Sequence, residues 1–168
     1  PMEAGRDGND AYDLIDSMVM AADPGVSDEK LARIEKLACP TCGSCSGMFT
    51  ANTMNNLSEA LGMSLPFNGS APAVFSERIW LAKESDYKAV DLVQKNLKPL
   101  DIMTKNAFHN AIAADMALGG STNTALHIPA LAYYAGLELT LRDFDPFDCP
   151  DVPPPNYPLH YSLVEMLT

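Results

Sequence analysis

The sequence has few basic residues, no long apolar run and no export signal. Lysine and arginine number 11 against 22 acidic residues, for a net charge of −11. This balance argues against a protein whose main task is to bind nucleic acid or an anionic membrane. Without an apolar run of about 18 residues, we expect no membrane-spanning helix. The opening residues lack the charged and apolar segments of a secretory signal.

Cysteine is also scarce, and it is unevenly placed. Three of the four cysteines, Cys39, Cys42 and Cys45, lie within one short stretch. Disulfide frameworks spread their cysteines along the chain, whereas tight clustering without an export signal favours metal or cluster chemistry. We therefore expect a cytoplasmic (bacterial) or organellar-matrix protein. The first residue, Pro1, is not an initiator methionine, which suggests that a segment precedes it.

Apolar residues recur every three or four positions along much of the chain, the spacing of amphipathic helices. The pattern predicts helices over residues 10–22, 28–38, 48–61, 73–98, 103–118 and 122–135. Ser27 is the expected N-cap of the second helix, and Gly62 and Gly119 are expected stops. Loops are predicted over residues 1–9 and 65–72, and only residues 137–141 look like a strand. The proline-rich segment after residue 145, which includes Cys149, is predicted to be extended or irregular.

The stretch Cys39-Pro-Thr-Cys42-Gly-Ser-Cys45 offers three thiolates at a spacing that lets sulfurs converge on zinc or an iron–sulfur cluster. Cys45 is the best placed, because unpaired N–H groups at a helix start stabilise a thiolate. Three interpretations remain open. Cys45 is a cluster ligand of an enzyme; or Cys39, Cys42 and Cys45, with or without Cys149, form a small zinc- or cluster-binding module; or the cysteines are packing residues of a helical interaction domain.

A second polar motif, Gly119-Gly120-Ser121-Thr122-Asn123-Thr124, lies between two predicted helices. The glycines permit close approach of the backbone to a ligand, and Ser121, Thr122 and Asn123 offer hydroxyls and an amide beside free helix N–H groups. The turn therefore either holds a carboxylate or phosphate, or is an ordinary C-cap followed by an N-cap.

Several of these stretches resemble the dihydroxy-acid dehydratase family. Residues 38–62 carry the resemblance most strongly, followed by Ala-Leu-Gly-Gly-Ser-Thr-Asn-Thr-Ala-Leu-His at residues 117–127 and by the opening Pro-Met-Glu-Ala-Gly. The resemblance covers residues 1–145, and residues 146–168 form a divergent proline-rich tail. Sugar-acid dehydratases of the same family, such as 6-phosphogluconate dehydratase, are less similar around the cysteines and are an alternative.

The resemblance implies a hydro-lyase that converts a 2,3-dihydroxy acid into a 2-oxo acid in branched-chain amino-acid biosynthesis. Its implied cofactors are an iron–sulfur cluster, 2Fe–2S or 4Fe–4S, and Mg²⁺. In the family, iron acts as a Lewis acid on the departing 3-hydroxyl, magnesium holds the carboxylate side and a base removes the C2 proton. By alignment Cys45 is a cluster ligand and Cys39 and Cys42 are its neighbours. Ser121, Thr122 and Asn123 are candidates for binding the substrate or for supporting residues that do.

The family's remaining site residues have no counterpart in the sequence. The Cys-Asp-Lys motif, an earlier cysteine, a later magnesium-binding glutamate and the serine proposed as base are all absent. We therefore expect the isolated chain to be inactive and to hold no stable cluster. The resemblance implies an α/β fold, with this chain as a helix-rich fragment of the family's N-terminal parallel-sheet domain with flanking helices. It also implies a homodimer for the complete protein, and apolar helix faces left exposed on the fragment.

Overall fold

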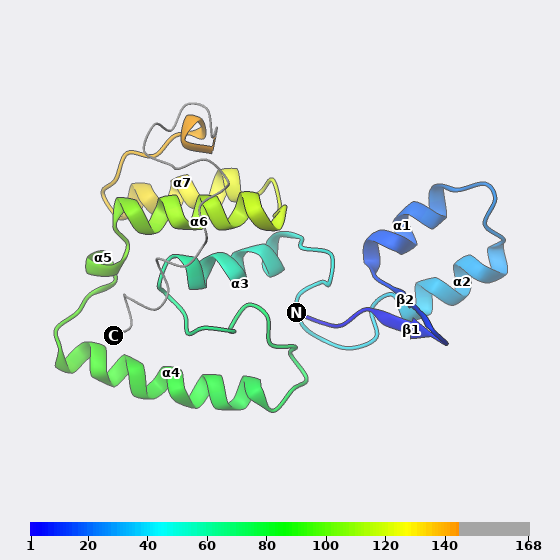
Figure 1. Cartoon of the computed structure of the whole chain (residues 1–168), viewed down its shortest axis with the longest axis horizontal. Helices are drawn as coiled ribbons and strands as arrows, with labels where there is room; N and C mark the ends of the chain where they lie inside the picture. The colour runs from blue at the N-terminus through cyan, green and yellow to red at the C-terminus, as the bar shows by residue number, and fades with distance from the viewer. Residues whose placement is uncertain (145–168) are drawn as a thin grey trace.

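Two groups of elements make up the computed structural model, which describes residues 1–144 (Figure 1). The first group contains strands β1 (Gly5–Asp7) and β2 (Asp10–Tyr12) and helices α1 (Leu14–Ala22) and α2 (Asp28–Leu37). The second contains α3 (Thr50–Ala60), α4 (Glu77–Gln94), α5 (Pro99–Ile102), α6 (Lys105–Leu118), α7 (Thr124–Tyr134) and the 3-10 helix η1 (Leu141–Phe144). The predicted irregular segment beyond residue 145, with Cys149, lies outside the described residues.

The first group corrects two predictions. Residues 1–9 were expected to be a loop and residue 10 to begin a helix, but β1 and β2 pair antiparallel, with Gly5 opposite Tyr12 and Asp7 opposite Asp10. Helix α1 begins later because the Asp13 side chain accepts hydrogen bonds from the N–H groups of Ile15 and Asp16, at 2.7 and 3.0 Å. That cap fixes the helix start and frees the preceding residues for the hairpin.

The expected fold class is confirmed in its helical content and not in its sheet. Within residues 1–144 the β1–β2 hairpin is the only sheet, and it is antiparallel, so the parallel sheet expected from the resemblance is not confirmed there. No helix of this part of the chain is both long and apolar enough to cross a membrane. The predictions from the sequence therefore agree with the structure mainly in the positions of the helices.

The helices follow local signals. Ser27 caps α2 as predicted, accepting a hydrogen bond from the Lys30 N–H at 3.3 Å. Gly119 ends α6 in the left-handed conformation, with φ of 63°, as a C-terminal glycine commonly does. The long helix predicted over residues 73–98 is shorter, because Asn96 turns the chain at φ of 52° and Pro99 opens the separate helix α5.

The strand predicted over residues 137–141 is wrong. Residues 137–140 carry no regular structure, and η1 follows them. Asp143 accepts hydrogen bonds from the N–H and hydroxyl of Thr140, at 2.6 and 3.0 Å, and the backbone hydrogen bond from Thr140 lowers the pKa of Asp143. Leu137 and Leu139 pack against the core, so their alternation reflects burial of one side of a loop.

The hydrophobic core lies where α3, α6 and α7 meet. Leu57 and Leu61 come from the α3 segment, Phe108 and Ile112 from α6, and Ile128 from α7. Alanines complete the contact, and their small side chains let the helices approach closely: Ala107, Ala111 and Ala132. Leu57 and Phe108 are fully buried, so this three-helix contact holds the second group together.

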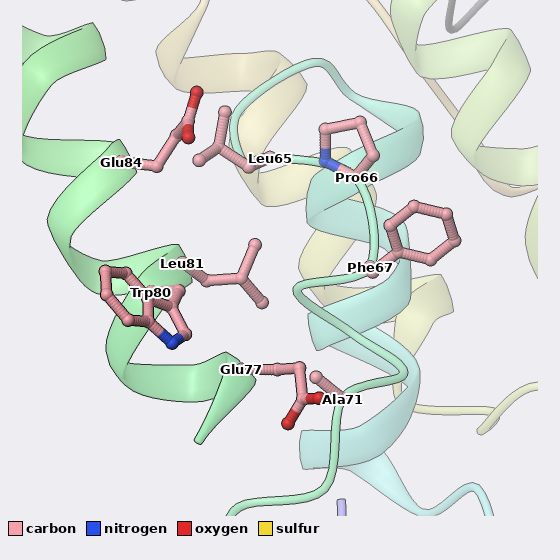
Figure 2. Close-up of a pocket in the computed structure, with 8 residues that line it drawn as sticks. All are labelled: Leu65, Pro66, Phe67, Ala71, Glu77, Trp80, Leu81 and Glu84. Atoms are coloured by element: carbon pink, nitrogen blue, oxygen red, sulfur yellow. The ribbon is translucent and has the colours of Figure 1, made fainter. Parts of the chain in front are cut away.

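Helix α4 contributes no buried residue. Trp80 and Val93 are 65% and 80% exposed, and on α1 the predicted apolar stripe at Ile15 and Val19 is exposed as well. These faces match the expectation that apolar helix surfaces remain uncovered. A hollow of about 410 Å³ lies between the first half of α4 and the loop of residues 65–71, and Figure 2 shows the side chains that line it.

Truncating a core side chain should therefore lower the free energy of unfolding far more than truncating an exposed side chain of α4. We expect Phe108→Ala to lower the free energy of unfolding by about 3–5 kcal/mol, because a large cavity is left between α3, α6 and α7. The matched control, Val93→Ala, should change it by less than about 0.5 kcal/mol. Urea denaturation followed by circular dichroism measures both. Equal effects of the two substitutions would contradict this account of the core.

Candidate metal centre at the start of helix α3

The cysteine-rich loop joins α2 to α3 and runs between the two groups of elements (Figure 1). Its middle is fixed against the chain start, where the Met2 N–H donates to the Ser44 carbonyl at 2.7 Å. Gly43 adopts φ of 118°, and a Cβ there would lie 2.7 Å from the Ala73 Cβ. Only glycine accommodates that conformation and that contact. The loop is therefore held on both sides before it reaches Cys45.

The three cysteines of the loop are free and differ in exposure. Cys39 and Cys42 are exposed, whereas Cys45 is half-buried. Within residues 1–144, no three cysteine, histidine or carboxylate side chains come together in a way that could hold a metal ion. The structure thus does not bring the three sulfurs to one centre, as a zinc module built on them requires.

Cys45 lies at the head of α3, as its sequence position predicts. Its Sγ accepts a hydrogen bond from the N–H of Phe49, at 3.2 Å. Phe49 is the N-cap residue of α3, and its side chain makes no capping hydrogen bond. The sulfur therefore serves as a local acceptor where the positive end of the helix favours negative charge.

Two asparagines of α3, which sequence reasoning missed, hold the Cys45 backbone. The Asn52 side-chain amide donates to the Cys45 carbonyl at 2.8 Å. Asn56 donates to the Asn52 side-chain oxygen at 3.3 Å and so orients that amide. Asn52 is only 5% exposed. A signal was available in the sequence: amides four residues apart fall on one helix face, close to the cysteine that precedes the helix.

Thr53 is the third residue of α3 that sequence reasoning missed. Its side chain is fully buried, and its hydroxyl donates to the Met48 carbonyl at 2.8 Å. Met48 adopts the left-handed conformation, with φ of 53°, which is uncommon for a residue with a side chain. The hydroxyl thus holds the turn by which the chain passes from Cys45 into α3.

The glycine-rich turn after α6 packs against this same helix start. The Ser121 N–H donates to the Thr53 hydroxyl oxygen at 3.1 Å, and the Asn123 amide donates to the Thr50 hydroxyl at 2.5 Å. The third candidate of the turn, Thr122, is exposed. The structure therefore brings together two motifs that lie about 70 residues apart, through the Ser121 backbone N–H and the Asn123 side chain. The Ser121 hydroxyl stays within the turn, where it accepts hydrogen bonds from the Asn123 N–H at 3.3 Å and from the Asn123 amide at 3.2 Å.

Gly120 in the turn packs against the side chain of Asp115 in α6. A Cβ on Gly120 would lie 2.0 Å from Asp115 Oδ1 and 2.7 Å from the Thr53 methyl carbon, so only glycine fits. Asp115 is 6% exposed, and its Oδ2 accepts a hydrogen bond from the Thr124 hydroxyl at 2.6 Å. Its Oδ1 has no hydrogen-bond partner among the described residues. No pattern in the sequence separates this buried carboxylate from the solvated acidic residues.

Two buried hydroxyls flank the candidate ligand. The side-chain oxygens of Ser44 and Ser46 are buried without a hydrogen-bond partner in the described part of the chain. Buried polar groups are usually paired, and these two hydroxyls belong to the residues directly before and after Cys45 in the sequence. The hollow of Figure 2 is a different place: none of its lining residues comes from residues 39–49 or 119–124.

Comparison with known proteins gives these features a context. The relatives that match the chain include three named dihydroxy-acid dehydratase. The protein of Halothermothrix orenii is 62% identical over 71% of the chain, that of Moorella thermoacetica 54% over 86%, and that of Clostridium pasteurianum 55% over 83%. The matched regions are 22%, 27% and 50% of the relatives' own lengths, so the chain spans about a quarter of the first two.

The family comparison covers nearly the whole sequence. Residues 1–150 match the family described as dihydroxy-acid/6-phosphogluconate dehydratase, N-terminal. This match includes both motifs that meet at the start of α3, and the chain therefore belongs to the dihydroxy-acid/6-phosphogluconate dehydratase family.

Proposed function

We propose that this chain supplies one thiolate ligand, Cys45, to the iron–sulfur cluster of an enzyme that dehydrates a 2,3-dihydroxy acid to a 2-oxo acid. The observation that carries the proposal is the Cys45 sulfur at the head of α3, accepting the Phe49 N–H, in a family whose named relatives are dihydroxy-acid dehydratases. The whole enzyme would serve branched-chain amino-acid biosynthesis in the cytoplasm or an organellar matrix, as a homodimer.

The residues around Cys45 fit a cluster. A cluster ligand is a thiolate, and hydrogen bonds to its sulfur and to the inorganic sulfides tune the centre. The Phe49 N–H is one such donor. We propose that the hydroxyls of Ser44 and Ser46, which have no hydrogen-bond partner among the described residues, donate to the bound cluster. Cys39 and Cys42 are exposed, which suits neighbours of the ligand better than ligands. The cluster type, 2Fe–2S or 4Fe–4S, depends on ligands outside residues 1–144.

When bound, the cluster supplies a Lewis-acidic iron for the departing hydroxyl. The chain's own residues position its ligand: Asn52 holds the Cys45 carbonyl, and Thr53 holds the Met48 turn. Ser121 and Asn123 donate to α3, so we assign them to supporting Cys45. Thr122 is exposed, as Asn123 is, and it is the candidate of the turn that we leave for contact with the substrate.

Magnesium does not fit the described residues alone. Within residues 1–144, no three potential ligands converge, and a magnesium site is built on carboxylate oxygens, substrate and water. We infer that the protein ligands of this ion, like the other cluster cysteines, lie outside the described residues. The chain by itself would then be inactive.

The role of Cys45 is tested in a full-length relative, at the aligned position. Cys45→Ser should remove the cluster's visible absorbance and reduce dehydratase activity by more than about 100-fold, because a residue that binds the cluster directly is lost. The matched control, Cys42→Ser, should retain the absorbance and most of the activity. Iron and sulfide analysis with steady-state kinetics measures both. Equal loss in the two variants would instead support a module that uses several of these cysteines.

The isolated chain should hold no stable cluster. Anaerobic reconstitution of the purified 168-residue chain with ferrous iron and sulfide is expected to give no lasting cluster absorbance and no turnover of a 2,3-dihydroxy acid, because one thiolate cannot hold a cluster. A full-length relative treated in parallel is the positive control. A stable chromophore with turnover in the isolated chain would show that these residues suffice.

A further inference from the structure

One peptide group connects Thr53 to the Cys45 sulfur. The carbonyl of the Met48–Phe49 peptide accepts the Thr53 hydroxyl, at 2.8 Å, and the N–H of that same peptide donates to Cys45 Sγ, at 3.2 Å. A peptide group is planar and trans, so its carbonyl and N–H point in opposite directions. Whatever fixes the carbonyl therefore also aims the N–H at the sulfur.

The Met48 backbone needs such a restraint. Its φ of 53° lies in the left-handed region, which a residue with a Cβ disfavours. If the carbonyl lost its hydrogen bond, the peptide could rotate toward an ordinary conformation, and its N–H would turn away from the sulfur. The bond from Thr53 opposes that rotation.

Thr53 is itself held in one orientation. Its hydroxyl oxygen accepts the Ser121 N–H at 3.1 Å, so its own proton is directed to the Met48 carbonyl. Its methyl group faces Gly120, where a Cβ would come within 2.7 Å of the methyl carbon. Full burial excludes water as an alternative partner. A continuous series of hydrogen bonds thus runs from the turn after α6 to the sulfur, and such series strengthen each member by polarisation.

We propose that Thr53 is a positioning residue for Cys45: its hydroxyl fixes the Met48–Phe49 peptide and thereby the N–H···S hydrogen bond on the cluster ligand. The part that concerns the cluster rests on the proposed function, whereas the part that concerns the Phe49 N–H does not. The proposal also gives the glycine-rich turn a role: its Ser121 N–H orients the Thr53 hydroxyl.

Two substitutions separate the hydroxyl from the methyl group. Thr53→Val keeps the shape and removes the hydroxyl, whereas Thr53→Ser keeps the hydroxyl and removes the methyl. Amide hydrogen exchange by NMR on the metal-free chain reports the Phe49 N–H directly. We expect it to exchange about tenfold faster in Thr53→Val, as loss of a typical hydrogen bond implies, and at close to the wild-type rate in Thr53→Ser. The Ile112 amide in the α6 core is the internal control.

Each outcome decides the proposal. Unchanged Phe49 exchange in Thr53→Val, with Ile112 still protected, would overturn it. If Thr53→Val unfolds the chain, Thr53→Ser decides: retained Phe49 protection supports the hydroxyl's role. Selective loss of that protection in Thr53→Ser would assign the role to the methyl contact with Gly120 and would overturn the proposal as well.

The cluster part is tested in a full-length relative with the aligned substitutions. A hydrogen-bond donor to the ligand sulfur stabilises the added negative charge of a reduced cluster. Thr53→Val should weaken the Phe49 N–H···S hydrogen bond, so the reduction potential of the cluster should fall. In Thr53→Ser, which keeps the hydroxyl, the potential should stay near the wild-type value. Equal potentials in all three proteins would overturn this part. Absence of any cluster from the wild-type relative would instead refute the proposed function, and the exchange result for Phe49 would stand.

Discussion

The two hydrogen bonds of the buried Thr53 hydroxyl are the interactions on which the rest of the site depends. A buried polar group must find partners within the protein, because its desolvation is otherwise uncompensated. Thr53 meets this requirement by joining two segments that are remote in sequence, the Met48 turn and the turn at Ser121. One and two turns further along the same α3 segment, Leu57 and Leu61 pack against α6. The hydrophobic contact keeps water out, and in that dry setting the hydrogen bonds gain strength.

Features set by local chemistry could be predicted from the sequence. The helices, the Ser27 cap, the Gly119 stop and the place of Cys45 before a helix all depend on residues within one or two turns of each other. The hairpin at β1 and β2 was missed because its three-residue strands are too short to show a period. The strand predicted near residue 139 was wrong because Thr140 and Asp143 close a local turn. A period of two in so short a segment cannot distinguish a strand from a loop with one buried side.

The site was predictable only in part, for a related reason. The place of Cys45 at a helix start could be predicted, because the helix that follows it is set by its own residues wherever the rest of the chain lies. The partners of Ser121 and Asn123 could not be predicted, because a free N–H or amide in a turn can donate equally well to a ligand or to a neighbouring helix. Only the tertiary contact with Thr53 and Thr50 decides between them. The left-handed turn at Met48 was hidden for the same reason, because its stabilising partner lies in the next turn of helix and is itself held by Ser121.

The long motif over residues 38–62 can be understood as the holder of a single sulfur. Asn52 fixes the carbonyl of Cys45, Phe49 donates to its sulfur and Thr53 fixes the peptide between Met48 and Phe49. These restraints concern one cysteine, and the described residues place none comparable on Cys39 or Cys42, which are exposed. A module that closed around its metal would need each sulfur oriented with similar care. The concentration of restraints on Cys45 therefore supports the proposal that this segment supplies one ligand and that the remaining ligands come from other residues.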